Sequence, residues 1–261
     1  MTNPSVSKQK IVRSLANQLE TDLFLGGRWL PMAPPDLTAR QSVIPQETSE
    51  IMPKKSNPKT VVEKQNKLET LAKHVRQCTK CPLHESRTNG VPGEGHSDTR
   101  LVFVGEAPGA DEDAQGRPFV GRAGQLLTKI IVAMGLKRED VFICNILKCR
   151  PPGNRDPQDF EIKACVAYLY EQLDIIQPEI IVALGAHAAR TLLNSTEAIG
   201  RLRGCTHPFI PAPMREPIKL VATYHPAYLL RNYTQDARRR VWDDMQLVLK
   251  ELHLPVPNRN A

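Results

Sequence analysis

The sequence has few aromatic residues and no long apolar run. Only 5% of its 261 residues are Phe, Trp or Tyr. No segment approaches the about 20 consecutive apolar residues that a membrane-spanning helix needs. The N-terminal region also lacks the apolar stretch and the small-residue cleavage site of a secretory signal. We therefore expect a soluble, cytoplasmic protein without a membrane partner.

Cysteine is also scarce, and six cysteines in a chain of this length do not indicate a disulfide scaffold. Cys78 and Cys81 form a close pair, whereas Cys149 and Cys165 have fifteen residues between them. Four thiolates can hold Zn²⁺ or an iron–sulfur cluster. A zinc ribbon supplies two close pairs, so this uneven spacing favours an iron–sulfur cluster. Cys165 also falls on the apolar face of a predicted helix, where a buried core thiol is the alternative.

The net charge is modest, at +7 from 35 Lys and Arg against 28 Asp and Glu. Such an excess suits a polyanionic partner, but many solvated surfaces have a similar balance. Charge alone therefore identifies no function.

The first 65 residues differ from the rest of the chain. Residues 8–25 carry apolar side chains at helical spacing, and residues 31–64 are rich in Pro, Ser, Thr, Gln and Lys. The second composition is typical of a flexible linker. The short helix is either a docking element for a protein partner or a solvated extension. We expect an extension over 1–65, one folded domain over 66–252 and a tail over 253–261.

Strand and helix patterns alternate within the expected domain. Apolar runs predict strands at 101–104, 141–147, 180–184 and 219–223. Helical patterns lie at 123–134, 162–176, 186–193 and 237–252. This alternation predicts an α/β fold with a mostly parallel sheet covered on both faces. Ligands of such folds bind outside the carboxyl ends of the strands.

Chemically useful residues follow three of these strands. A glycine-rich segment, Gly105 to Gly109, follows the first strand, Asn145 ends the second and His225 follows the fourth. Glycine lets a ligand approach the backbone, and an amide offers the adjacent donor and acceptor that grip the edge of a base. Each feature alone is ordinary: a loop, a turn asparagine or a structural His-Pro. Their shared position at one edge of the sheet predicts a site.

Taken in order, the motifs resemble those of the family 4 uracil-DNA glycosylases. They are Gly-Glu-Ala-Pro-Gly at 105–109, Gly-Arg-Pro-Phe-Val-Gly at 116–121, Asn-Ile-Leu-Lys-Cys-Arg-Pro-Pro-Gly-Asn-Arg at 145–155, Leu-Gly-Ala-His-Ala at 184–188 and Tyr-His-Pro-Ala-Tyr-Leu-Leu at 224–230. The resemblance covers about residues 66–252. It implies a three-layer α/β/α domain with a central, mostly parallel four-stranded sheet. It also implies a structural [4Fe-4S] cluster held by Cys78, Cys81, Cys149 and Cys165.

The same resemblance assigns roles around a uracil flipped out of DNA. Phe119 stacks on the base, Asn145 hydrogen-bonds its edge, His225 stabilises the leaving anion, and the backbone of Gly105, Glu106 and Ala107 helps to hold the base. The segment 227–231 is similar to the loop that fills the gap in the duplex, with Leu229 or Leu230 as the wedge. Candidate phosphate contacts are Lys148, Arg150, Arg155, Arg201, Arg203 and Arg231.

One position departs from the pattern of the wider superfamily. Relatives place an Asp in the first motif to position the attacking water, and here that slot holds Ala107. Glu106 is the nearest carboxylate, and Glu112 and Asp113 follow in the loop. The sequence does not decide which carboxylate orients water, or whether electrostatic stabilisation of an oxocarbenium-like sugar suffices.

Three functions fit these observations to different degrees. The first is an enzyme, expected to be a monomer, that hydrolyses the uracil–deoxyribose bond and leaves an abasic site in base excision repair. The second is a non-catalytic module that binds uracil or damaged DNA, which Ala107 favours. The third is a redox iron–sulfur protein, which leaves the motifs at the strand ends without a purpose.

Overall fold

The computed structural model describes residues 57–210 and 217–257. Residues up to Val256 within these ranges belong to one compact unit. The helix predicted at 8–25, and the linker up to residue 56, lie outside the described residues. None of the helices in the described ranges is long and apolar enough to cross a membrane.

A single sheet of six strands forms the centre of the domain, in the order β1-β3-β2-β4-β6-β5. The four inner strands are parallel: β3 (Phe142–Asn145), β2 (Leu101–Gly105), β4 (Ile180–Leu184) and β6 (Ile218–Thr223). These are the four predicted strands. The short β1 (Glu94–Gly95) and β5 (Thr206–Phe209) add antiparallel edges.

The expected count of four strands is thus too low by the two edge strands. Strand β1 has only two residues, and β5 is mostly exposed and contains Pro208. Neither forms an apolar run, so hydrophobic pattern could not find them. Proline is tolerated in β5 because an edge strand leaves some backbone donors unpaired.

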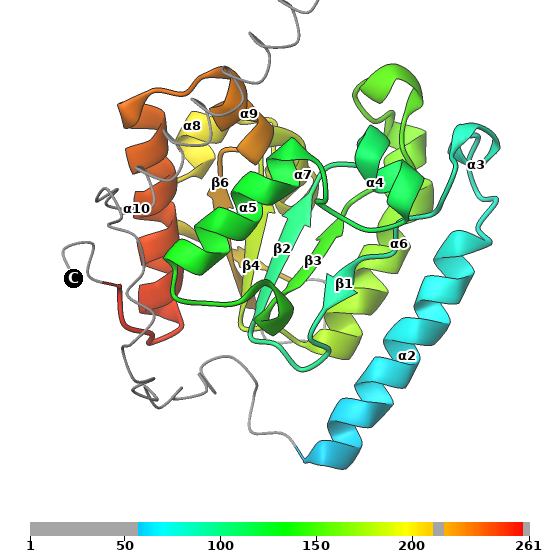
Figure 1. Cartoon of the computed structure of the whole chain (residues 1–261), viewed down its shortest axis with the longest axis horizontal. Coiled ribbons are helices and arrows are strands. Elements are labelled where there is room, and N and C mark those ends of the chain that lie inside the picture. The colour runs from blue at the N-terminus through cyan, green and yellow to red at the C-terminus, as the bar shows by residue number, and fades with distance from the viewer. Residues whose placement is uncertain (1–56, 211–216, 258–261) are drawn as a thin grey trace, which may run out of the picture. The chain divides into compact units, whose positions relative to one another are not determined.

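Alternate residues of the inner strands build two separate cores. Leu101 and Phe103 pack with α5 (Arg122–Ala133) and α10 (Gln235–Glu251), whereas Val102 and Val104 pack with α6 (Asp159–Ile176) and α7 (Ala186–Leu193). Figure 1 shows α5 and α10 on one side of the sheet and α6 and α7 on the other. Because neighbouring strand residues point to opposite faces, a buried strand must be apolar throughout. The expected three-layer α/β/α arrangement is confirmed.

Helix α2 (Pro58–Arg76) begins before the expected domain boundary at residue 66. The Asn57 side chain accepts a hydrogen bond from the Lys59 N–H at 3.1 Å, and Pro58 occupies the first turn, where it needs no donor. Leu71 and Val75 are buried. The helix lies beside α6 (Figure 1). Residues 58–65, expected as linker, are therefore the first turns of a packed helix.

The carboxyl ends of the parallel strands meet at one edge of the sheet. In the strand register, Gly105 lies beside Asn145 and Leu184 lies beside Thr223. Helices α4 (Ala110–Gln115), α7 and α9 (Pro226–Arg231) are grouped at this edge in Figure 1. The remaining short helices are α3 (Leu83–Ser86), η1 (Arg138–Asp140), η2 (Pro152–Asn154) and α8 (Ile199–Leu202). Residues distant in sequence thus converge on one site.

Candidate active site

A cavity of about 670 Å³ opens at the carboxyl edge of the sheet. Its walls come from the segments that follow β2, β3, β4 and β6. The lining includes all the predicted base-contacting side chains. It also includes three residues of the sequence motifs to which no role was assigned: His187, Tyr224 and Tyr228. The predicted location of the site is therefore where the structure has its cavity.

Asn145 and Phe119 meet at the end of β2 because Gly105 has no side chain. A Cβ atom at position 105 would lie 2.3 Å from Asn145 Oδ1 and 2.5 Å from the Phe119 ring. Asn145 is buried, and its Oδ1 accepts no hydrogen bond from the described residues. A buried acceptor without a partner costs free energy unless a ligand satisfies it. The amide therefore has the geometry of a recognition group.

Phe119 is held in a backbone conformation that side chains rarely adopt, with φ at +51°. Such strain persists only where the surroundings impose it. Gly124 makes room for the turn, since a Cβ there would lie 1.9 Å from the Phe119 carbonyl oxygen.

His225 lines the cavity and caps α9. Its Nδ1 accepts a hydrogen bond from the Ala227 N–H at 3.1 Å. Burial, and secondarily the charge of Arg231, lowers the pKa of His225 to about 4. The imidazole is therefore neutral at neutral pH, and with Nδ1 as acceptor its proton sits on Nε2. The ring centroid lies 5.7 Å from that of Phe119.

Glu112 has a structural task that the sequence did not reveal. Its Oε1 accepts from the N–H groups of Val120 and Gly121, both at 2.9 Å, and its Oε2 accepts from the Gly109 N–H at 3.1 Å. A carboxylate offers about four lone-pair sites, so these bonds occupy most of them. The side chain ties the first glycine-rich loop to the loop that carries Phe119.

Glu106 presents a carboxylate with a different environment. It is partly buried on the cavity wall. Burial raises the pKa of Glu106, with His187 lowering it and Asp156 raising it further. The three side chains place ligand atoms within 4.8 Å of one another, close enough to share a cation, and His187 Nε2 lies 3.6 Å from the Asp156 carboxylate. Asp156 lies in a loop, whereas His187 lies in the first turn of α7, within the motif at 184–188. Neither residue was predicted to contribute to the site.

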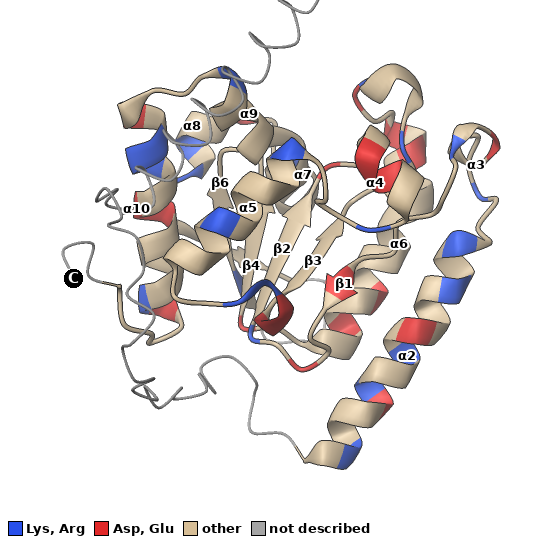
Figure 2. Ribbon diagram, in the orientation of Figure 1, with Lys and Arg blue, Asp and Glu red and all other residues tan. Residues whose placement is uncertain are grey.

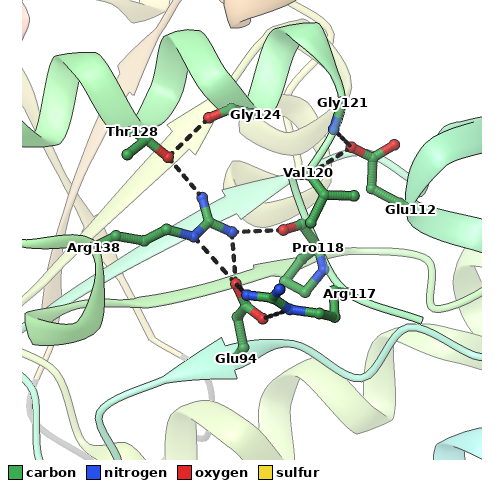
Figure 3. A network of polar contacts seen from close by, with 9 residues as sticks. All are labelled: Glu94, Glu112, Arg117, Pro118, Val120, Gly121, Gly124, Thr128 and Arg138. Carbon is green, nitrogen blue, oxygen red and sulfur yellow. Dashed lines mark hydrogen bonds and ion pairs between the residues drawn. The ribbon is translucent and has the colours of Figure 1, made fainter. Parts of the chain in front are cut away.

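A polar network of residues outside the cavity lining holds the segment Pro118 to Gly121, which carries Phe119 (Figure 3). The Arg138 guanidinium donates to the Pro118 carbonyl at 2.7 Å, to Thr128 Oγ1 at 3.1 Å and to Glu94 at 2.7 Å. Arg117 donates to the other oxygen of Glu94 at 2.8 Å. Burial opposes the ionisation of Glu94, but the two arginines together hold its pKa below the usual value. The network anchors the residue immediately before Phe119.

The four predicted metal-ligating cysteines lie in one cluster on the side of the domain next to α2. Cys149 and Cys165 are buried, and Cys78 and Cys81 pack against them. Burial raises the pKa of both buried thiols, that of Cys165 to about 11. Three N–H donors reach the sulfur atoms: Arg87 Nη1 to Cys149 at 2.9 Å, the Lys148 N–H to Cys165 at 3.2 Å and the Lys80 N–H to Cys78 at 3.5 Å.

The residues predicted to contact DNA differ in how exposed they are. Leu229 is fully buried in the core and Leu230 also packs against that core. Either side chain would have to leave these contacts to act as the predicted wedge. Arg231 is exposed at the cavity, and Arg150 is partly exposed and donates to Asn154 Oδ1 at 2.7 Å.

Three further predicted phosphate contacts are occupied within the protein. Lys148 is buried, with Nζ 2.6 Å from Gln172 Oε1. Arg203 is paired with the buried Asp244, and Arg155 with the buried Glu161. Figure 2 shows the acidic residues of α4 on one side of the site edge and basic residues on α8 and the first turns of α10 on the other. On α10, Arg239 and Arg240 are paired with Asp236, whereas the predicted contact Arg201 on α8 is exposed.

Comparison with protein families agrees with this geometry. The family model described as "Uracil DNA glycosylase superfamily" matches residues 92–246. The matched range contains all six strands and the main cavity-lining loops.

Similarity to individual curated proteins shows to which subgroup of the superfamily the chain belongs. A type-4 uracil-DNA glycosylase of Thermotoga maritima is 48% identical over 180 residues, which are 69% of this chain and 91% of the relative. The type-4 enzyme of Archaeoglobus fulgidus is 46% identical, over 62% of this chain and 83% of the relative. That of Saccharolobus solfataricus is 45% identical, over 71% and 86%. The chain belongs to the uracil DNA glycosylase superfamily and, within it, to the type-4 uracil-DNA glycosylases.

The network of Figure 3 predicts unequal effects for its two arginines. Arg138→Met should lower the free energy of unfolding by about 1–3 kcal/mol, because it removes several partly buried hydrogen bonds and leaves the Pro118 carbonyl without its donor. Arg117→Met is the matched control: Arg117 is mostly exposed and contacts only Glu94 here, so about 0–1 kcal/mol is expected. Urea denaturation measures both. Equal losses would show that the network does not anchor the loop.

Proposed function

We propose that the chain is a uracil-DNA glycosylase that cleaves the N-glycosidic bond between uracil and deoxyribose, leaving an abasic site in base excision repair. The observation that carries the proposal is the buried, unpartnered Oδ1 of Asn145, set beside an aromatic ring and a neutral histidine in one cavity. Membership of the type-4 family supports the same reaction.

Recognition requires the base to leave the duplex, because the cavity walls cannot reach a stacked nucleotide. Uracil presents an N–H donor next to a carbonyl acceptor on its pairing edge. Asn145 Oδ1 can accept from that N–H while its amide nitrogen donates to the carbonyl. Cytosine presents the opposite order and would leave both groups mismatched. Stacking on Phe119 adds about 1–3 kcal/mol without regard to base identity, so Asn145 supplies the discrimination.

The chemical step develops negative charge on uracil. The bond between C1′ and N1 breaks, its electron pair leaves with the base, and a water oxygen bonds to C1′ and releases a proton. A neutral His225 with its proton on Nε2 can donate a hydrogen bond to a uracil carbonyl as the anion forms. A donor that is fixed in place before reaction gains most at that moment.

We assign the water-positioning role to Glu106 rather than to Glu112. The oxygens of Glu112 are engaged by three backbone N–H groups, whereas the Glu106 carboxylate lies on the cavity wall next to the vacant slot left by Ala107. An ionised Glu106 would orient the water, accept its proton and favour the positive charge that develops on the sugar. Glu112 then acts as a positioning residue for the Phe119 loop.

The four cysteines fit an iron–sulfur cluster. The thiols come from the segment between α2 and α3, from the segment after β3 and from α6. N–H donors of Arg87, Lys80 and Lys148 point at three of the sulfur atoms. Such hydrogen bonds are typical partners of cluster thiolates. When bound, a [4Fe-4S] cluster would cross-link these elements. The thiols lie outside the cavity lining, so no part of bond cleavage is assigned to it.

His225→Ala should reduce the single-turnover rate of uracil release from a uracil-containing oligonucleotide by about 10²–10³, the usual effect of losing one fixed donor to a developing anion. Affinity for the oligonucleotide should change much less. Wild-type protein that binds uracil-DNA without releasing uracil would instead support the non-catalytic module that Ala107 favours. An unchanged rate in His225→Ala would remove this residue from the mechanism.

Glu106→Gln should abolish the acidic limb of the pH–rate profile, which is the fall in rate as the pH is lowered. The pKa of Glu106 is raised, so its carboxylate ionises at a higher pH than an ordinary glutamate and the wild-type rate should fall as pH decreases through that range. The variant should be slow and insensitive to pH there. Glu112→Gln is the comparison: it keeps one amide oxygen as acceptor and should retain the limb. A limb that persists in Glu106→Gln would transfer the role to another group.

Purified protein should carry about four irons per chain and absorb visible light. Cys149→Ala or Cys165→Ala should lose iron and lower the thermal midpoint, because metal binding contributes directly to folding. Cys205→Ala, at an exposed thiol far along the chain, is the control and should retain iron. Iron analysis and thermal melts measure both. Stoichiometric zinc without iron after anaerobic purification would contradict the assignment.

A further inference from the structure

Two side chains of the cavity lining have no part in the proposed reaction, His187 and Asp156. His187 lies in the first turn of α7, and Asp156 lies in the loop that follows η2. One imidazole nitrogen of His187, one oxygen of Asp156 and one oxygen of Glu106 all lie within 4.8 Å of one another. Three segments that are distant in sequence therefore bring two acids and one base together at the cavity.

Backbone contacts fix the two segments that carry the carboxylates. The Leu147 N–H donates to the Glu106 carbonyl at 2.9 Å, which ties Glu106 to the segment after β3. The Arg155 guanidinium donates to the Asp156 carbonyl at 3.0 Å and is also paired with Glu161. The two acids therefore meet because the fold brings their segments together, not because they are neighbours in the chain.

The start of α7 is fixed against the segment that carries His225. Gly185, which precedes α7, has φ at +93°, a conformation that favours glycine. A Cβ atom there would lie 3.0 Å from His225 Cβ, so a side chain at this position would crowd the histidine. His187 follows two residues later, and 37% of its side chain is exposed. Its imidazole therefore projects from a rigid helix start at the edge of the cavity.

His187 and Asp156 act on Glu106 in opposite directions. Burial raises the pKa of Glu106, the charge of His187 lowers it, and the charge of Asp156 raises it. His187 Nε2 also lies 3.6 Å from the Asp156 carboxylate. The remaining titratable side chains of the lining come from α4, the loop after η2, the segment after β6 and α9, and do not contribute to this shift. They are Glu112, Arg155, Tyr224, His225, Tyr228 and Arg231.

We infer that His187 is a positioning residue that acts through Glu106: its protonated imidazole keeps the Glu106 carboxylate ionised on the cavity wall. Asp156 holds the imidazole and opposes its effect on Glu106. The inference rests on the proposed function, in which Glu106 orients the attacking water. His187 needs no contact with uracil for this role, because it reaches the reaction only through the charge of Glu106.

The sign of each effect follows from the charges. An ionised Glu106 can accept the proton of the attacking water, whereas a protonated Glu106 cannot. A positive neighbour favours the ionised carboxylate, so His187 preserves the rate toward lower pH. A negative neighbour favours the protonated form, so Asp156 has the opposite influence. Neutralising the two residues one at a time should therefore displace the acidic limb of the pH–rate profile in opposite directions.

Single-turnover rates of uracil release measure this displacement. Full-length, iron-loaded protein is used in excess over the oligonucleotide, so that binding does not limit the rate. His187→Gln should move the midpoint of the acidic limb to higher pH by roughly 0.5–1 pH unit, the effect of one charge at about 4 Å in a largely solvated site. Asp156→Asn should move it to lower pH, because an imidazole keeps its proton in the acidic range. At high pH the rates of His187→Gln and wild type should converge.

Arg190→Gln is the matched control. It also removes a positive charge from α7, but Arg190 lies outside the cavity lining and donates to the Glu197 carbonyl at 2.8 Å. Its midpoint should equal that of wild type. Iron content and thermal midpoints show whether each variant is folded, and a midpoint of the acidic limb is compared only between folded proteins.

Three results would overturn the inference. They are an unchanged midpoint in His187→Gln, an equal displacement in Arg190→Gln, and a displacement of the same sign in His187→Gln and Asp156→Asn. Failure of the proposed function gives different results: wild-type protein releases no uracil, or the acidic limb persists in Glu106→Gln. The two failures are therefore distinguishable.

Discussion

The carboxylate of Glu112 is the contact on which the site depends. It accepts backbone hydrogen bonds from Gly109 on one loop and from Val120 and Gly121 on another. Hydrogen bonds from neutral donors to a charged acceptor are stronger than those between neutral groups. These hydrogen bonds hold the strained backbone conformation of Phe119, which places its ring next to Gly105. The network of Arg138 and Glu94 supports the same loop from the outer side (Figure 3).

The electrostatics of the cavity suit a reaction that creates an anion beside a polyanion. His225 is neutral because it is buried and because Arg231 is near, so it can donate without holding a permanent charge in the cavity. A cationic histidine would bind phosphate and uracil alike, whereas a neutral donor favours the state in which charge has developed. Permanent positive charge lies instead on exposed side chains around the cavity, such as Arg231 and Arg201.

Sequence reasoning predicted the parts of the fold that depend on continuous apolar segments. The four inner strands and the helices covering them follow from residues such as Leu101–Val104, all of which are buried. The edge strands were missed because an exposed strand has no such signal. Within the site, Asn145 and His225 were found because each lies at the end of a strand, while Asp156 reaches the cavity from a loop and His187 from the first turn of α7. The orientation of Leu229 could not be read from the motif, because the turn of α9 that buries it depends on contacts with α5 and α10.

In α9, the position of each residue around the helix axis decides whether its side chain is buried or exposed. Each residue advances about 100° around an α-helix, so one extra residue before Tyr228 would bring the aromatic ring to the buried position of Leu229. One missing residue would bring Leu229 to the exposed position of Tyr228. Such a change in length would also separate the helix from its cap at His225. The segment therefore has little tolerance for insertions and deletions, whereas Ala227 and other partly exposed positions can still change their side chains. Loops that vary in length among related chains should lie elsewhere on the surface.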